Sequence, residues 1–249
     1  MEKKYRLTEE TIEFLGRTLH RIEACRDFGT VKKGYKGGYI EKESNLSQYD
    51  NAWVYGNAWV YGDAKVYGNA WVYGDAKVSD NAKVSGDATV SGNATVSGNA
   101  TVSGDATVSG NATVSGNAWV SGDATVYGDA KVYGNAKVYG DAKVSDNAWV
   151  YGNANVYGNA WVYGDAKVSG DATVSGNADF IVFKNWWSSG RYFTWTRSNN
   201  KWRVRCFYGT GEELIKKAYA DSEKSGREYE RVVRYVEAIL ADGQNQDIS

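Results

Sequence analysis

Apolar residues recur with a strict period through the middle of the chain, from Asp50 to about Phe180. Alanine occupies every sixth position from Ala52 to Ala178, and valine follows two residues after each alanine as far as Val174. Alternation of small apolar, variable, apolar and polar positions is the period of a strand with one buried face. No insertion interrupts the series, so the pattern predicts a repeat architecture.

Each six-residue unit also ends in a turn. The unit reads Asn/Asp, Ala, variable, Val, Tyr/Ser, Gly. Glycine adopts positive φ without strain, and Asn and Asp tolerate left-handed conformations and bond to their own backbone. Short strands that turn the same way at every corner build a coil rather than a hairpin ladder. The repeat therefore predicts a parallel β-helix.

The repeat resembles the hexapeptide-repeat family of left-handed β-helices, in which three hexapeptides complete each triangular coil. The resemblance covers residues 50–180 and implies a mainly β fold with a left-handed triangular parallel β-helix of about seven coils. With eighteen residues per coil, the variable positions fall on three faces. The second face runs from Trp59 to Lys167 and the third from Lys65 to Thr173. The first face carries Trp53, Trp71, Thr89, Thr107, Thr125, Lys143 and Trp161.

The segment before the repeat, residues 1–49, is expected to form an N-terminal β cap. Strand-like alternation over 11–14 and 18–22 predicts a hairpin, and Gly37–Gly38 predicts a turn that leads into the repeat. The expected core residues of this irregular segment are Val31, Ile40 and Leu46.

The segment after the repeat, residues 181–249, is expected to form a small C-terminal α+β domain. The stretches FIVFKNWW, RYFTWTR and KWRVRCFY predict three strands. Two helices should follow, with capping boxes at Thr210/Glu213 and at Ser225/Glu228. The second helix carries an apolar stripe that must pack on another element. The stripe consists of Tyr229, Val232, Val233, Val236, Ile239 and Leu240.

Enzyme chemistry of the resembled family is not expected here. Its acyltransferases use a histidine base between subunits and an extended loop that breaks the repeat, whereas this chain has His20 alone and no interruption. We therefore predict a non-enzymatic protein without a catalytic residue, cofactor or metal ion; a degenerate acyltransferase is the remote alternative. Cys25 and Cys206 are expected to be free thiols in a reducing compartment.

Location and origin are inferred from the ends of the chain and from the leader of the repeat. No apolar run approaches the ~20 residues of a membrane span, and the polar start MEKKYRLTEE is unlike a signal peptide. We therefore expect no membrane association and a cytoplasmic location. The stretch from DFG to the first repeat resembles the leader of hexapeptide-repeat proteins of phages and prophages. That resemblance implies an accessory protein in a bacterial host, and inhibition of a host defence system is one hypothesis.

Outward aromatic residues near the ends of the repeat, including Trp53, Trp71 and Trp161, are the first candidates for binding. One interpretation is that they stack between neighbouring rungs and stabilise the coil, or that they are buried against the caps. The other is that they form an exposed patch that binds a protein or another copy of the chain.

A basic and aromatic segment of the C-terminal domain supplies the second set of candidates. Alternation places Lys201, Arg203 and Arg205 on one strand face and Trp202 on the other. Such a surface can meet an acidic protein, bind phosphates or stack single-stranded bases, or it can be a solvated face over an aromatic core. The net charge of −1 gives nucleic acid little support. The candidates are Trp186, Trp187, Arg191, Trp195, Arg197, Lys201, Arg203 and Arg205.

The function expected from these observations is that of a binding or scaffold protein. A rigid β-helix would present the C-terminal domain to a macromolecular partner, most simply a host protein. A structural, self-assembling or virion-associated element is the alternative.

Overall fold

The structure is a computed structural model that describes residues 2–246 of the 249-residue chain. It divides into two compact units, residues 1–177 and 178–249. We call the first the solenoid unit and the second the C-terminal domain. The prediction of a mainly β solenoid with a small α+β region is confirmed.

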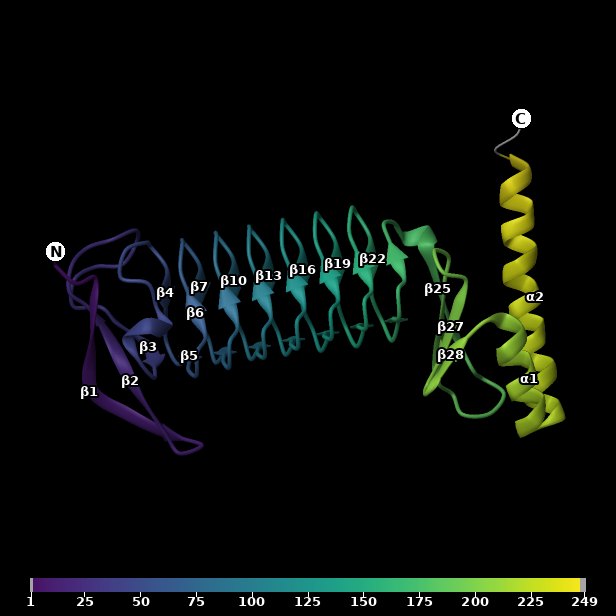
Figure 1. Cartoon of the computed structure of the whole chain (residues 1–249), viewed down its shortest axis with the longest axis horizontal. Helices are drawn as coiled ribbons and strands as arrows, with labels where there is room; N and C mark the ends of the chain where they lie inside the picture. The colour runs from purple at the N-terminus through teal and green to yellow at the C-terminus, as the bar shows by residue number, and fades with distance from the viewer. Residues whose placement is uncertain (1, 247–249) are drawn as a thin grey trace. The chain divides into compact units, whose positions relative to one another are not determined.

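The solenoid unit consists of short strands arranged in three parallel sheets (Figure 1). The first sheet contains β4 (Trp53–Val54), β7 (Trp71–Val72), β10 (Thr89–Val90), β13 (Thr107–Val108), β16 (Thr125–Val126), β19 (Lys143–Val144) and β22 (Trp161–Val162). The second contains β5 (Trp59–Val60), β8 (Lys77–Val78), β11 (Thr95–Val96), β14 (Thr113–Val114), β17 (Lys131–Val132), β20 (Trp149–Val150) and β23 (Lys167–Val168). The third contains β6 (Lys65–Val66), β9 (Lys83–Val84), β12 (Thr101–Val102), β15 (Trp119–Val120), β18 (Lys137–Val138), β21 (Asn155–Val156) and β24 (Thr173–Val174).

Pairing between coils has a register of eighteen residues. Thr89 pairs with Trp71 on one side and with Thr107 on the other. The Trp71 N–H donates to the Ala88 carbonyl at 2.9 Å, so each rung bonds its backbone to the next. Three hexapeptides per coil and the three predicted faces are thus confirmed. With an irregular first turn the solenoid has about eight turns. Its left-handedness stays a prediction.

Glycine closes most corners, and the coils leave no room for a side chain there. Gly104 has φ +69°, and a Cβ atom added to it would lie 2.9 Å from the backbone nitrogen of Gly122. Asp80 and Asp146 replace glycine at two corners and still adopt positive φ. The Asp80 carboxylate accepts a hydrogen bond from the Gly98 N–H at 2.9 Å, which compensates for part of the conformational strain.

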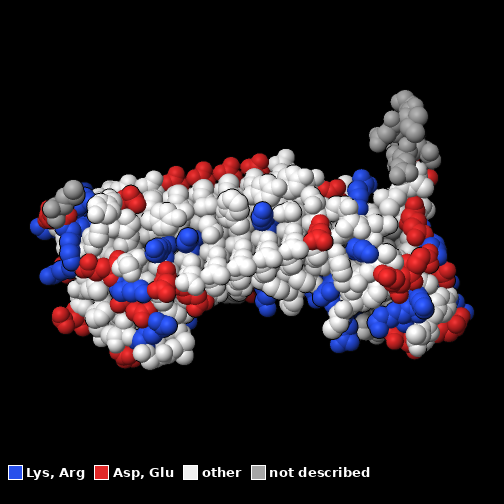
Figure 2. Space-filling view, viewed as in Figure 1, with Lys and Arg blue, Asp and Glu red and all other residues white. Residues whose placement is uncertain are grey.

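Corner residues of successive coils form side-chain rows. At one corner asparagine amides bond from coil to coil at 3.0–3.1 Å, through Asn81, Asn99, Asn117, Asn135, Asn153 and finally Asp171. At another corner the repeat places aspartate in four successive coils, at Asp87, Asp105, Asp123 and Asp141. Figure 2 shows a row of acidic side chains along one edge of the solenoid.

The N-terminal segment caps the first end of the solenoid. Strands β1 (Tyr5–Phe14) and β2 (Arg17–Ala24) form the predicted hairpin, and β2 continues antiparallel onto β3 (Lys36–Ile40). Because β3 pairs in parallel with β5, it covers the first edge of the second sheet, and the hairpin extends that sheet beyond β3. A 3₁₀ turn follows at Glu43–Asn45.

Two glycines of this cap are not turn residues, which corrects the sequence prediction. Gly37 and Gly38 lie within β3 and are buried. A Cβ on Gly37 would lie 2.5 Å from the Val54 carbonyl oxygen, and one on Gly38 equally close to that of Ala58. They are needed for the close approach of β3 to the first coils. The expected core residues Val31, Ile40 and Leu46 are buried.

Lys4 closes the end of the core beneath this cap. Its side chain is fully buried, and its Nζ donates to the Asp50 and Ala52 carbonyl oxygens at 2.9 Å each. Burial lowers the pKa of Lys4 to about 8, although the nearby Asp50 carboxylate acts in the opposite direction.

The regular repeat ends at Val174, before the predicted Phe180. A 3₁₀ turn at Asn177–Asp179 follows, and Phe180 begins an antiparallel sheet instead of another coil. This sheet has the order β25 (Phe180–Lys184), β26 (Tyr192–Thr196), β27 (Lys201–Val204) and β28 (Phe207–Gly209). The predicted third strand is thus a hairpin, with Arg205 in its turn at φ +51°.

Two helices complete the C-terminal domain: α1 (Gly211–Asp221) and α2 (Glu223–Gln246). The capping box at Thr210 and Glu213 is confirmed. The one predicted at Ser225 is wrong because α2 already begins at Glu223. Ser222 precedes the helix, and its hydroxyl accepts a hydrogen bond from the Ser225 N–H at 3.1 Å.

One face of the sheet packs against both helices. Register places Phe193 opposite Phe183 and Trp195 opposite Trp202, so their side chains share this face. The predicted stripe of α2 packs on it, apart from Ile239, which is exposed. The buried cluster comprises Trp187, Phe193, Trp195, Trp202, Leu214, Ile215, Ala218, Tyr229, Val233 and Val236.

Candidate binding site in the C-terminal domain

The loop between β25 and β26 is held by one buried side chain, Asn185. Its Oδ1 accepts hydrogen bonds from the backbone N–H and the hydroxyl of Ser188, both at 3.0 Å. Its Nδ2 donates to the Tyr229 hydroxyl oxygen of α2 at 3.0 Å. Trp187 packs edge-to-face on Tyr229 with ring centroids 5.0 Å apart. These contacts fix the loop to the core, and they leave the neighbouring Trp186 73% exposed.

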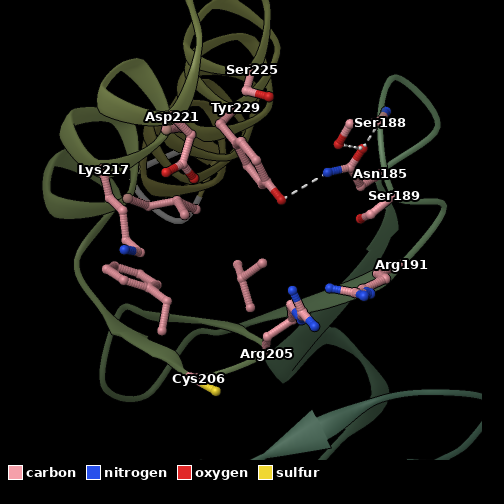
Figure 3. Close-up of a pocket in the computed structure, with 14 residues that line it drawn as sticks. Asn185, Ser188, Ser189, Arg191, Arg205, Cys206, Lys217, Asp221, Ser225 and Tyr229 are labelled. Atoms are coloured by element: carbon pink, nitrogen blue, oxygen red, sulfur yellow. Dashed lines mark hydrogen bonds between the residues drawn. The ribbon is translucent and has the colours of Figure 1, made fainter.

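A cavity of about 400 Å³ opens between this loop, the β27–β28 turn and the two helices (Figure 3). Its apolar wall is formed by Val204, Phe207, Leu214 and Ala218. Its polar lining consists of Asn185, Ser188, Ser189, Arg191, Arg205, Cys206, Lys217, Asp221, Ser225 and Tyr229.

Positive charge predominates in this lining, with Arg191, Arg205 and Lys217 against the single carboxylate of Asp221. Figure 3 shows Arg191 and Arg205 next to each other on one side of the cavity, with Lys217 across from them. Within residues 2–246 neither arginine has a carboxylate within ion-pair distance. By contrast, Arg227, Arg231 and Arg234 of α2 are all paired with glutamates. The cavity therefore holds cationic groups available to a ligand.

The Tyr229 hydroxyl offers a further donor. Because Ser188 fixes the orientation of the Asn185 amide, Tyr229 must be the acceptor in its bond with Nδ2. Burial raises the pKa of Tyr229, so the hydroxyl keeps its proton at neutral pH. Among the hydrogen bonds of the described residues, that proton has no acceptor. Tyr229 is only 8% exposed and lines the cavity, so the proton can be donated to a group bound there.

Two of the tryptophans predicted as binding residues are core residues instead. Trp187 is 7% exposed and Trp195 only 2% exposed. The Trp195 indole N–H donates to Asn200 Oδ1 at 2.8 Å, which fastens the β26–β27 turn. They were misassigned because alternation shows which residues share a face but not which face the helices cover.

The predicted basic residues do not form one surface in the structure. Lys201 and Arg203 lie on the sheet face opposite Trp202, as the alternation predicted. Arg205 does not join them, because the strand ends at Val204 and Arg205 lines the cavity. Arg197 lies just after β26, exposed and away from the cavity lining. Arg191 precedes β26 and lines the cavity with Arg205.

Solenoid tryptophans differ in exposure. Trp53 confirms the interpretation of burial against the cap, and its candidacy for binding is wrong: it is fully buried, with Phe28 of the cap 5.2 Å away between ring centroids. Trp71 and Trp161 are 41% and 42% exposed. Other aromatic residues stack between rungs, such as Tyr133 on Tyr151 at 4.9 Å. The stacking interpretation thus applies to some positions, and binding at the exposed ones stays a prediction.

Asn185, Lys217 and Asp221 were not identified as candidates from the sequence, and Tyr229 was treated only as an apolar residue. For Lys217 and Asp221 the helical spacing could have indicated a shared face. Lys217, Ala218 and Asp221 follow Leu214 at i+3, i+4 and i+7, so the four residues lie along one side of α1. Asn185 had no such signal, because its role depends on a loop that folds back on α2.

The remaining features of interest are possible metal ligands, the two cysteines and His20. No group of three His, Cys, Asp or Glu side chains suited to a metal ion occurs among the described residues. Cys25 and Cys206 are free thiols. His20 lies in the hairpin with Nδ1 3.2 Å from the Thr8 carbonyl oxygen. No helix in the described part of the chain is long and apolar enough to cross a membrane.

The solenoid unit is similar to a known family of repeats. The model of the YdcK beta solenoid repeat matches residues 82–98, 88–104, 94–110, 106–122 and 148–164. The chain is a repeat protein of the β-solenoid type. The matches fall within the coils and include no residue of the C-terminal domain. No curated protein matches the chain.

Proposed function

We propose that this chain is a non-enzymatic binding protein, in which the solenoid is a rigid support and the C-terminal domain binds a protein partner. The observation that carries the proposal is the side chain of Trp186, which is 73% exposed on a loop that Asn185 and Trp187 anchor to the core. A large exposed indole held in place loses little conformational entropy on binding.

The loop that carries Trp186 also borders the cavity of this domain, which suits a protein interface. Arg191 and Arg205 line that cavity, and tryptophan, tyrosine and arginine are the side chains that most often dominate binding energy at interfaces. The surface joins one apolar anchor to cationic groups, which favours a partner with an acidic patch.

The solenoid supports this proposal through its uniformity. Its coils repeat without interruption from β4 to β24, and each is bonded to the next through the backbone. Such a stack changes shape little, as expected of a scaffold.

The proposal includes the origin of the chain and its biological role. The leader before the repeat resembles that of hexapeptide-repeat proteins of phages and prophages, which supports an accessory protein in the cytoplasm of a bacterial host. A host protein is then the simplest partner, and inhibition of a defence system is one outcome of binding it.

The test is site-specific cross-linking in a bacterial lysate, with a photoreactive phenylalanine analogue at position 186 of the full chain. We expect a discrete cross-linked protein from position 186 and none from position 235, where Tyr235 is comparably exposed on α2. Arg205→Glu should abolish the product, whereas Arg197→Glu should not. Equal cross-linking from both positions would refute a partner site at Trp186.

Self-assembly is a second candidate, favoured by the exposed Trp71 and Trp161 of the first sheet. Replacement of both by threonine, the residue that β10, β13 and β16 carry at this position, leaves the coil pattern intact. If these side chains join copies of the chain, sedimentation should show an oligomer for the parent and a monomer for the double variant.

A further inference from the structure

The cavity of the C-terminal domain has the chemistry of an oxyanion site with an apolar wall. Arg191 and Arg205 lie on one side of it without a carboxylate partner among the described residues (Figure 3). Two guanidinium groups side by side repel each other, and an anion between them removes that repulsion. The planar fork of arginine matches both carboxylate and phosphate oxygens.

Neutral donors add to the guanidinium groups. The Tyr229 hydroxyl has a proton without an acceptor among the described hydrogen bonds, and Ser189 lies beside Arg191 in the lining. The oxygens of a bound anion would accept these bonds. An anion in the cavity would give the Tyr229 proton an acceptor.

The rest of the cavity requires an apolar body on the ligand. Val204, Phe207, Leu214 and Ala218 offer no hydrogen bonds through their side chains, and a volume of about 400 Å³ exceeds that of a bare anion. Asp221 and Lys217 lie across from the arginine pair and carry opposite charges, so the net positive charge of the lining corresponds to Arg191 and Arg205.

We propose that this cavity binds an oxyanion group, carboxylate or phosphate, carried on an apolar or aromatic body. The inference deepens the proposed function, because a protein partner would supply such a group as an acidic or phosphorylated side chain next to its contact with Trp186.

Small probes test the cavity independently of any partner. NMR titrations of the full chain at low salt would use phenyl phosphate, phenylacetate and, as neutral control, benzyl alcohol. We expect both anions to shift resonances of residues 185–191 and 204–207, with benzyl alcohol about tenfold weaker or more. Tighter binding of phenyl phosphate would indicate a phosphorylated ligand, and equal or tighter binding of phenylacetate a carboxylate.

Variants locate the binding. Arg191→Gln and Arg205→Gln should each weaken phenyl phosphate about tenfold, whereas Arg197→Gln, which removes an exposed arginine outside the cavity, should leave it unchanged. Tyr229→Phe should weaken it less, because one neutral hydrogen bond is lost. Arg205→Lys keeps the charge and should retain part of the affinity, which guards against a folding defect of the Gln variant.

Absence of shifts with both anions, equal affinity of benzyl alcohol, or full affinity in both arginine variants would overturn the inference. These outcomes are separable from failure of the proposed function. If the anions bind the cavity but position 186 gives no cross-link, the anion site stands and the protein partner is refuted. If the cross-link forms but neither anion shifts the resonances of the cavity, the partner stands and the anion site is refuted.

Discussion

In the solenoid unit every repeat buries one alanine and one valine, none more than 1% exposed, whereas the C-terminal domain buries five aromatic side chains in a core of ten residues. The first core is a sum of small, equivalent contributions, and each coil depends mainly on its neighbours. The core of the C-terminal domain depends on a few large side chains that pack together in a single cluster. The effect of a core substitution should therefore stay local in the solenoid unit and spread through the whole C-terminal domain.

The largest effect is expected from Trp202→Ala in the C-terminal domain. Loss of a buried tryptophan costs about 3–5 kcal/mol, which a small domain can hardly tolerate. Hydrogen exchange should accelerate throughout residues 180–240 while the coils stay protected. The matched change Val108→Ala removes two carbon atoms from the solenoid and should cost about 2 kcal/mol or less, with faster exchange confined to neighbouring coils. Global loss of protection in Val108→Ala would break the comparison.

A smaller effect is expected from glycine at the corners of the coils. Gly104→Ala forces an alanine into positive φ, which costs about 1–2 kcal/mol, and its Cβ would also lie 2.9 Å from the Gly122 nitrogen. Gly164 has φ +63° but nothing within 4 Å of such a Cβ. Thermal unfolding should therefore show a larger loss for Gly104→Ala than for Gly164→Ala. Equal losses would mean that coil spacing adapts freely.

The capped end of the solenoid should carry a pH dependence of its own. The pKa of Lys4 is about 8 in the folded chain and ordinarily 10.5, so between these values the unfolded state binds more protons. Stability should rise as pH increases from 8 towards 10, because the cost of burying the charged ammonium is relieved. Above pH 10 Tyr5 has the opposite effect on stability. Burial raises its pKa, so the folded state keeps a proton that the unfolded state loses, and stability falls as pH rises further.

Urea unfolding between pH 7.5 and 10 measures this effect. Lys4→Met, which keeps the apolar stem, should flatten the rise. A rise of the same size in the variant would assign the pH dependence to another group.

The smallest effect concerns the two kinds of corner row. Asp123 lies between Asp105 and Asp141, whereas Asn117 bonds to Asn135 at 3.0 Å. Asp123→Asn removes a repelling charge and adds an amide donor, so it should stabilise the solenoid by about 0.5–1 kcal/mol, less at high salt. Asn117→Asp should have the opposite sign. Melting temperatures at two salt concentrations would show whether the rows behave alike.

Much of the solenoid could be predicted because its information is local. The six-residue unit shows which side chain is buried, which position varies and where the chain turns. Its repetition determines the register of pairing between coils. Predictions failed where a unique contact decided the outcome. Trp53 has the same place in its repeat as Trp71, yet only Trp53 is covered by the cap.

The candidate site was predictable only in part. The predicted candidates include Arg191 and Arg205, which line the cavity, and the exposed Trp186, but Trp187 and Trp195 were grouped with them although they belong to the core. Arg205 was placed on the wrong side because the strand was expected to continue where a two-residue turn reverses it. Alternation along one strand cannot show where that strand ends.

The coil can be derived from the amino-acid sequence alone: its period, its three faces, its alanine and valine core and its glycine corners. These follow from short-range sterics and burial that every repeat satisfies in the same way. The exposure of each tryptophan, and the cations that share a cavity with Tyr229, depend on the folded structure. Those properties arise when a loop, a strand turn and two helices meet, and such non-local packing leaves no period in the sequence.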